Sequence, residues 1–314
     1  MKKSIKAIII TLVIAAFAIV VVFMVDEKLL APIGIIGTFI GILGGFIPYL
    51  NSKRVDIKRA DTAQKRHKEI LEGQQELLKT IRETQPQNAS ESLKEEVKTA
   101  EERLTNPITA DDFFLKAYAA HVDENYSKAI EHYNKVIELE PDFERAFCNK
   151  GAALHNLGWH KKAIECFDKA IEYDENDAYA HNNKGASLND LGRHEEAIDC
   201  LDKAIEYQNN FAEAYNNKGV ALNDLGKHEE AIDCYDKAIE YKNEFAEVYV
   251  NKWVALYDLG KYEEAIDCLD KAIEYKKNLS KAYNNKGVVY QALGNEDKAN
   301  ECFKKAEDIK NKKK

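Results

Sequence analysis

Asparagine recurs beside lysine at a fixed interval through the second half of the chain. The tetrapeptide Asn-Asn-Lys-Gly occurs three times, and two related tetrapeptides lie on the same spacing of 34 residues. An asparagine amide carries both donors and acceptors, so a row of amides can pair with a peptide backbone whatever its side chains are. The recurring asparagines are Asn149, Asn182, Asn183, Asn216, Asn217, Asn251, Asn284 and Asn285.

Cysteine and histidine also recur, but their spacing argues against metal or redox chemistry. Five cysteines from Cys166 to Cys302 lie 34 residues apart, and none forms a CxxC pair. His160, His194 and His228 each precede one of these cysteines by six residues. Six residues turn a helix through about 240°, so the two side chains diverge. We therefore expect no metal, cofactor or disulfide, and thiols that pack in a reducing compartment.

Neither the charge distribution nor any motif indicates an enzyme or a nucleic-acid-binding protein. Residues 1–109 carry 16 Lys/Arg and 13 Asp/Glu, whereas residues 110–314 carry 29 and 41. Nucleic-acid binding depends on neutralising phosphates, so the acidic second half excludes nucleic acid as the main partner. No pairing of a nucleophile with a base stands out in the sequence, so we expect no catalytic residues.

The elements that must position the asparagines are the helices of a repeat. A 34-residue period runs from residue 110 to residue 313 without insertion, and a fixed period in this range indicates a solenoid. Each unit is expected to be two helices joined by a turn, marked by Leu-Gly in units two to six. This predicts an all-α fold of six units, at 110–143, 144–177, 178–211, 212–245, 246–279 and 280–313.

The units resemble the tetratricopeptide repeat (TPR) family. In unit three, the family's alternation of small and large packing residues is present as Gly185, Leu188, Ala197, Leu201 and Ala204. The family's proline at position 32 occurs only once, as Pro141. The resemblance implies a right-handed α-solenoid whose concave groove binds protein or peptide segments.

A helical wheel assigns the asparagines to this groove. Positions 2, 5, 6, 9, 12 and 13 of each unit fall opposite the packing side of the first helix. In the family this set lines the groove, and here it includes the eight asparagines together with Asp190, Asp224 and Asp258. Amides beside carboxylates favour a neutral or basic segment. The alternative is that the asparagines bond neighbouring repeats or are simply solvated.

Four further positions of the repeat concern packing between helices. Lysine at position 7 is expected to lie along the packing edge with its ammonium in solvent. Trp253 replaces the position-8 glycine of its neighbours, which predicts a local distortion of unit five or a displaced neighbour. The isoleucines at positions 21 and 28 become Asn300 and Glu307 in unit six. These positions are therefore expected to face the following repeat, and unit six is expected to be a cap.

The first fifty residues are expected to form a transmembrane hairpin within a segment 1–52. Uncharged apolar runs at 7–25 and 29–50 are each long enough to span about 30 Å of hydrocarbon. A cleaved signal peptide is the weaker alternative. Basic residues flank both runs, which predicts that both termini and the repeats are cytoplasmic at a cell membrane. Gly37, Gly41 and Gly45 form a row that packs against the first span or against a second copy, so a homo-oligomer is an alternative.

Residues 53–109 are expected to be a basic helical stalk and a linker. A weak apolar register from Ala60 to Ile81 gives limited support for a coiled coil. The stretch 83–92 has the composition of a linker. A short helix at 93–104 is then expected to cover the apolar groove side of unit one, which otherwise forms an anchor pocket.

These observations predict a membrane-anchored cytoplasmic scaffold that binds protein or peptide segments in a TPR groove. One alternative is a self-assembling structural membrane protein in which the repeats are spacers. Another is an accessory subunit of a membrane enzyme complex.

Overall fold

The computed structural model describes residues 65, 72–104, 106–276 and 279–311. The predicted spans at 7–25 and 29–50 lie outside these residues, as does the glycine row. None of the helices in the described part combines the length and the apolarity needed to cross a bilayer. The chain divides into two compact parts, residues 1–73 and 74–314, and the second part contains all six repeat units.

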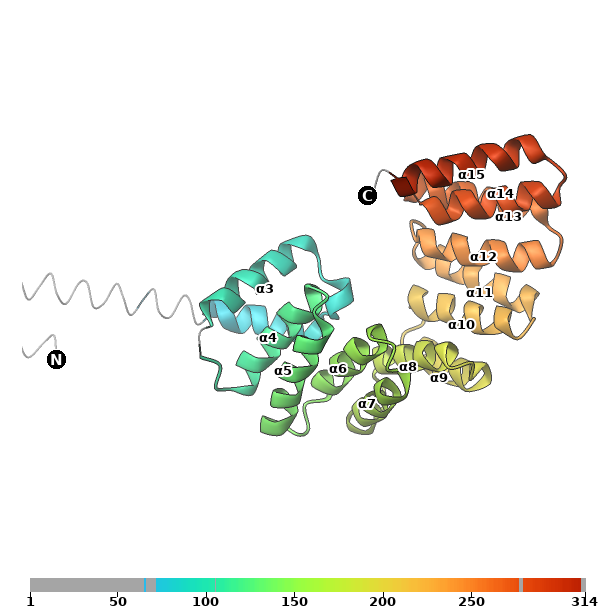
Figure 1. The fold of residues 1–314 in the computed structure, drawn as a ribbon. Coiled ribbons are helices and arrows are strands. Elements are labelled where there is room, and N and C mark those ends of the chain that lie inside the picture. Colours follow the sequence, from blue (N-terminus) through green and yellow to red (C-terminus); the bar gives the residue numbers. More distant parts are fainter. Residues whose placement is uncertain (1–64, 66–71, 105, 277–278, 312–314) are drawn as a thin grey trace, which may run out of the picture. The chain divides into compact units, whose positions relative to one another are not determined.

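Within residues 74–314, paired antiparallel helices follow one another in sequence order (Figure 1). The predicted all-α solenoid is confirmed for this part of the chain. The repeat helices are α4 (Ala110–Val122), α5 (Tyr126–Leu139), α6 (Glu144–Asn156), α7 (His160–Tyr173), α8 (Ala178–Asp190), α9 (His194–Tyr207), α10 (Ala212–Asp224), α11 (His228–Tyr241), α12 (Ala246–Asp258), α13 (Tyr262–Tyr275), α14 (Ser280–Ala292) and α15 (Glu296–Asn311).

The turn between the two helices depends on glycine in units two to six. Gly158 has φ of 76°, and Gly192, Gly226, Gly260 and Gly294 have similar values. This left-handed conformation is strained for residues with a Cβ. In unit two, Gly158 N donates to His155 O at 2.8 Å and Trp159 N donates to Leu154 O at 2.9 Å. These bonds end the first helix, and the second begins after three residues.

The glycine at position 8 lets the two helices of a unit touch. A Cβ on Gly219 would lie 2.6 Å from the Tyr235 ring, and one on Gly151 would meet Phe167 at the same distance. Leu201 and Phe303 fill the same place opposite Gly185 and Gly287. The large residue at position 24 therefore packs directly on the backbone of the first helix.

The position-21 isoleucines pack between consecutive repeats. Ile130 packs against the core of unit two, Ile164 lies in the core of unit three, and Ile232 packs against the core of unit five. The prediction that this position faces the following repeat is confirmed. Asn300 and Glu307, its counterparts at positions 21 and 28 of unit six, are exposed.

The position-7 lysines have a partner that the sequence interpretation missed. Lys184 Nζ lies 2.6 Å from Asp168, Lys218 and Lys252 lie 2.5 Å from Asp202 and Asp236, and Lys286 pairs with Asp270. Each aspartate is at position 25 of the preceding unit. The lysine stem lies along the packing edge, as predicted, but the ammonium forms an ion pair between repeats.

Unit one is covered by the segment that precedes it. Helix α3 (Glu91–Arg103) places Leu93 and Val97 in one core with Phe114 and Tyr118. The prediction that this helix covers unit one is confirmed, so there is no apolar anchor pocket at these described residues. Ala60, Ala63 and Ile70 of the coiled-coil register lie outside the described residues.

Two expectations for the segment before α3 are corrected. Leu77 and Ile81, on a helix that includes residues 72–83, are buried in the same core as Phe114. They are therefore not free to form the predicted coiled coil. The linker composition at 83–92 is also misleading, because η1 (Pro86–Asn88) is an ordered turn in which Pro86 and the preceding Gln85 are buried.

Candidate functional site

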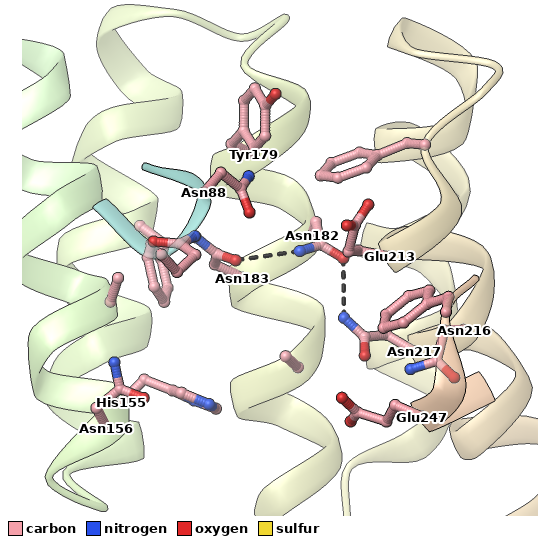
Figure 2. Close-up of a pocket in the computed structure, with 16 residues that line it drawn as sticks. Asn88, His155, Asn156, Tyr179, Asn182, Asn183, Glu213, Asn216, Asn217 and Glu247 are labelled. Atoms are coloured by element: carbon pink, nitrogen blue, oxygen red, sulfur yellow. Dashed lines mark hydrogen bonds between the residues drawn. The ribbon is translucent and has the colours of Figure 1, made fainter. Parts of the chain in front are cut away.

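A cavity of about 270 Å³ runs along the first helices of units two to five (Figure 2). The helices α6, α8, α10 and α12 contribute most of its lining, and η1 adds Gln87 and Asn88. The remaining lining residues are Ala152, His155, Asn156, Phe167, Tyr179, Asn182, Asn183, Ala186, Phe211, Glu213, Asn216, Asn217, Phe245 and Glu247. Amides, aromatic rings and two carboxylates therefore face the same space.

The asparagines in the cavity form a ladder between repeats. Asn217 Nδ2 donates to Asn182 Oδ1 at 2.9 Å, and Asn251 Nδ2 donates to Asn216 Oδ1 at 3.0 Å. Position 6 of one unit thus bonds position 5 of the unit before it. Asn182 Nδ2 also donates to Asn183 Oδ1 at 3.1 Å (Figure 2). The asparagines therefore bond neighbouring repeats, which was the alternative to a role in the groove. Four of them line the cavity as well.

The predicted groove residues separate into three groups. Asn182, Asn183, Asn216 and Asn217 line the cavity. Asn149 is 0% exposed, so the expectation that its amide faces the groove is wrong. The others lie outside the cavity: Asn251, Asn284, Asn285, Asp190, Asp224 and Asp258.

Unit five departs from the ladder in a way that explains Trp253. Position 5 is Val250, which cannot bond Asn285 of unit six. With the Asn285 amide turned to suit its neighbours, its oxygen accepts from Trp253 Nε1 at 3.0 Å and its nitrogen donates to Lys281 O at 3.3 Å. The indole therefore replaces the missing amide. Helix α12 keeps the length of 13 residues that α8 and α10 have, and the expected local distortion or displaced neighbour stays a prediction.

The carboxylates of the cavity are Glu213 and Glu247, which the sequence interpretation did not single out. Both are at position 2, which belongs to the groove set of the helical wheel. Glu213 pairs with Lys242 at 2.8 Å. Glu247 is exposed and has no ion-pair partner among the described residues. Beside them, the Tyr179 and Phe211 rings meet edge to face with centroids 5.0 Å apart.

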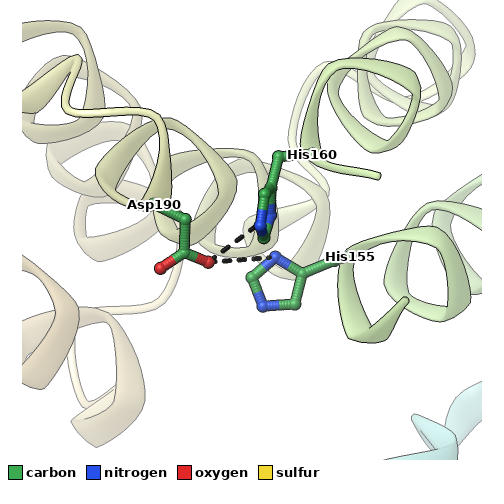
Figure 3. Close-up of side chains that lie close together, drawn as sticks. All are labelled: His155, His160 and Asp190. Atoms are coloured by element: carbon green, nitrogen blue, oxygen red, sulfur yellow. Dashed lines mark ion pairs between the residues drawn. The ribbon is translucent and has the colours of Figure 1, made fainter. Parts of the chain in front are cut away.

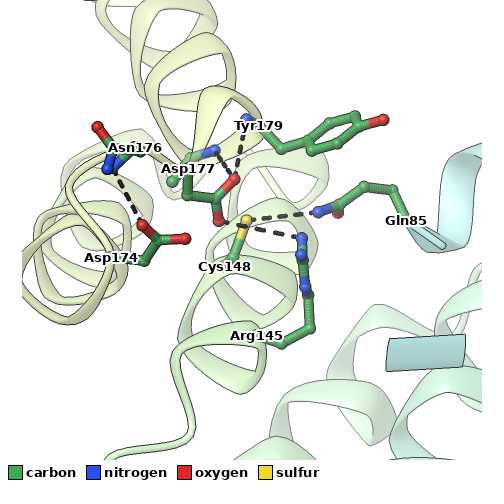
Figure 4. Close-up of polar contacts among 8 residues, drawn as sticks. Gln85, Arg145, Cys148, Asp174, Asn176, Asp177 and Tyr179 are labelled. Atoms are coloured by element: carbon green, nitrogen blue, oxygen red, sulfur yellow. Dashed lines mark hydrogen bonds and ion pairs between the residues drawn. The ribbon is translucent and has the colours of Figure 1, made fainter. Parts of the chain in front are cut away.

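A buried polar cluster holds the segment that covers unit one, residues 72–103, against units two and three (Figure 4). Gln85 Nε2 contacts Cys148 Sγ at 3.7 Å. Asp177 caps α8 by accepting from Tyr179 N at 2.9 Å and Ala180 N at 3.2 Å, and it lies 3.9 Å from Arg145 Nη1. Burial raises the pKa of the Cys148 thiol, so this cysteine is a packing residue and not a nucleophile.

The histidines are arranged differently from the pairs considered in the sequence. His160 approaches His155 and Asp190, a combination that the six-residue spacing to cysteine does not indicate. The sequence did contain one signal for this cluster, because position 12 of unit two is a histidine, His155. Burial lowers the pKa of His155, partly offset by the Asp190 carboxylate.

Family comparisons agree with this architecture. Models described as tetratricopeptide repeat match residues 144–177, 212–245, 166–199 and 280–313. A further model described as TPR repeat matches residues 123–158, 185–225 and 255–294. Together these matches include more than half of the chain. No curated protein sequence matches it.

Several solved structures are similar to the chain. The Cut9 and Hcn1 assembly of APC/C contains a chain that is 18% identical, with a TM-score of 0.64 over 69% of this chain and 43% of that one. PilF of Pseudomonas aeruginosa is 18% identical, with a TM-score of 0.55 over 65% and 90%. MamA is 28% identical over 52% and 95%, with a TM-score of 0.47. At 18% identity, the first two support the fold alone. On its repeats and the matching family models, the chain belongs to the tetratricopeptide repeat family.

Proposed function

We propose that this protein is a scaffold that binds an extended protein segment in the cavity along units two to five. The observation that carries the proposal is the lining, in which asparagine amides, aromatic rings and carboxylates from four consecutive units face one space. Amides can bond the backbone of a bound segment without regard to its sequence. Aromatic rings add apolar contact area for its side chains.

The charge of the cavity favours a basic segment. Glu213 and Glu247 are the charged groups of the lining, apart from the titratable His155. Because Lys242 already pairs with Glu213, Glu247 is the better partner for an incoming lysine or arginine. The acidic balance of residues 110–314 adds a favourable long-range field.

A peptide-display selection on the full-length chain tests this proposal. Selected peptides are expected to be enriched in lysine and arginine. Glu247→Gln is expected to weaken a selected peptide by about fivefold to tenfold, since one charge-assisted contact is lost. Glu229→Gln, which removes an exposed carboxylate from α11 outside the cavity, is the matched control. Peptides that bind wild type, Glu247→Gln and Asn183→Ala equally would place the binding surface elsewhere.

We further propose that residues 7–50 anchor the scaffold in a membrane with both termini and the repeats in the cytoplasm. The uncharged runs and their basic flanks support this topology. After alkaline carbonate extraction, the full chain is expected to stay in the membrane pellet and a chain lacking residues 1–52 in the supernatant. Protease added outside intact cells should leave the repeats uncut. Release of the full chain by carbonate contradicts the anchor, and external cleavage contradicts the topology.

A further inference from the structure

Two histidines and an aspartate meet where unit two contacts unit three (Figure 3). His155 lies in the last turn of α6, His160 begins α7, and Asp190 ends α8. The Nδ1 atoms of His155 and His160 are 3.6 Å and 3.5 Å from the same carboxylate oxygen, Asp190 Oδ2. The three side chains can each offer one ligand atom within 4.8 Å of the others.

These distances suit a metal ion better than hydrogen bonds. Separations of 3.5–3.6 Å exceed the range of N–H···O bonds. A tetrahedral zinc ion with bonds of about 2.0–2.1 Å holds its ligand atoms about 3.3–3.4 Å apart. His160 Nδ1 is buried and has no hydrogen-bond partner among the described residues. The two distances from the imidazoles to Asp190 are therefore close to the separations of ligand atoms in a zinc site.

The other junctions of the array lack this combination. The corresponding residues between units three and four are Asn189, His194 and Asp224. Between units four and five they are Asn223, His228 and Asp258, and there Asn223 Oδ1 bonds His228 Nδ1 at 2.9 Å. His194 Nδ1 is also buried without a partner, so an orphaned imidazole alone is not distinctive. The second imidazole, His155 in place of asparagine, is what distinguishes unit two.

Ser187 determines which ring nitrogen of His155 carries the proton before any ion binds. The Ser187 hydroxyl donates to Asn183 O at 3.0 Å, so His155 Nδ1, 3.0 Å from Ser187 Oγ, is the donor to that oxygen. An ion at Nδ1 would displace this proton. The serine then loses one incoming bond and keeps its bond to the backbone.

We propose that His155, His160 and Asp190 bind a divalent transition metal ion, Zn²⁺ foremost, across the junction of units two and three. Two imidazoles and one carboxylate suit Zn²⁺, whereas Ca²⁺ and Mg²⁺ prefer oxygen ligands. Three protein ligands leave the fourth position for water or for a donor group of a bound molecule. Because His155 also lines the groove cavity, the ion lies beside the proposed peptide site.

The test is Zn²⁺ titration of the chelator-treated full-length chain in detergent, with calorimetric stoichiometry. Wild type is expected to bind one ion. His155→Asn, which restores the residue of units three and four, and Asp190→Asn are each expected to weaken binding at least about tenfold, as removal of even an indirect metal contact does. His194→Asn is the matched control and should bind like wild type. Thermal melting should show Zn²⁺ stabilising wild type and His194→Asn but neither site variant.

Two further arms distinguish this site from adventitious binding. Co²⁺ in place of Zn²⁺ should give a tetrahedral spectrum without a thiolate charge-transfer band, because the ligands are nitrogen and oxygen. Asn189→His should create a second site with His194 and Asp224 and raise the stoichiometry to two. The proposal is overturned if wild type binds no ion, if His155→Asn and Asp190→Asn bind as wild type does, if cobalt reports thiolate ligation, or if Asn189→His still binds one ion.

Discussion

At the residue scale, the repeat period is 34 residues, but the asparagines that bond each other are 35 residues apart. Position 6 of one unit bonds position 5 of the unit before it, so Asn217 reaches Asn182 and Asn251 reaches Asn216. A side-chain amide bond contributes about 1 kcal/mol, and a buried amide left without its partner costs more. The ladder therefore fixes how consecutive repeats sit on each other while its outer atoms face the cavity.

The exchange of partners in unit five can be tested with paired substitutions. Trp253→Gly removes the donor to Asn285 and should lower the free energy of unfolding by about 2–4 kcal/mol, through lost burial and the unpaired amide. Adding Val250→Asn in the same chain supplies the ladder amide of the neighbouring units. The double variant should recover about 1 kcal/mol in urea denaturation. Val250→Asn alone is the control, and no recovery in the double variant would contradict the exchange.

His121 predicts a pH dependence of stability. It is 4% exposed, and burial lowers its pKa from 6.5 to about 4. Between these values the unfolded chain binds the proton and the folded chain does not, so stability rises with pH over this window. Lowering the pH from 7 to 4 should cost up to about 3 kcal/mol from this residue alone.

His121→Phe isolates this contribution. It keeps the ring contacts with Tyr126 and Tyr133 and removes the titration. Urea unfolding measured from pH 7 to pH 4.5 should give a shallower slope for this variant, by up to about 1.4 kcal/mol per pH unit. Other buried histidines continue to titrate, so some slope remains. An unchanged slope would mean that the pKa of His121 is the same in the folded and the unfolded chain.

At the scale of elements, the ion pairs between position 25 and position 7 omit the first junction. Lys150 of unit two faces unit one, where position 25 is Asn134 and not aspartate. Asn134→Asp should therefore add the pair seen at the next four junctions. Because the aspartates of those pairs are about half exposed, the expected gain in unfolding free energy is only about 0.2–1 kcal/mol. The gain should disappear in 1 M salt and in a Lys150→Met background, and a gain that persists there is not electrostatic.

The sequence predicts the helices, their turns and the faces that pack, because these follow from one repeat and its period. Gly158 and its equivalents end the first helices where Leu-Gly marks them, and Ile164 packs on the following unit. The sequence predicts less of the site, because contacts between units depend on how one repeat is rotated and shifted relative to the next. That offset pairs Asn182 with Asn217 and brings His155 to Asp190. The docking of Gln85 and Pro86 has no periodic signal at all.

At the scale of the whole array, each repeat depends on the one that follows it. Ile266 and Ile273 of unit five pack in a core that includes Ala282 and Val289 of unit six. A chain ending after residue 279 leaves both isoleucines to solvent. We expect it to aggregate and to lose hydrogen-exchange protection in α12 and α13, while α6 to α9 stay protected, because repeats contact only their neighbours.

The polar residues of unit six provide the rescue for this truncation. Ile266→Asn and Ile273→Glu give unit five the residues that unit six carries at the same positions, Asn300 and Glu307. In the truncated chain they should restore a monodisperse protein in size-exclusion chromatography, because they replace exposed apolar surface. In the full chain the same substitutions should lower stability by about 2–4 kcal/mol, since they bury polar groups between units five and six. Opposite effects in the two backgrounds would show that the polar residues suit a terminal face and not the repeat itself. Equal effects would contradict this role.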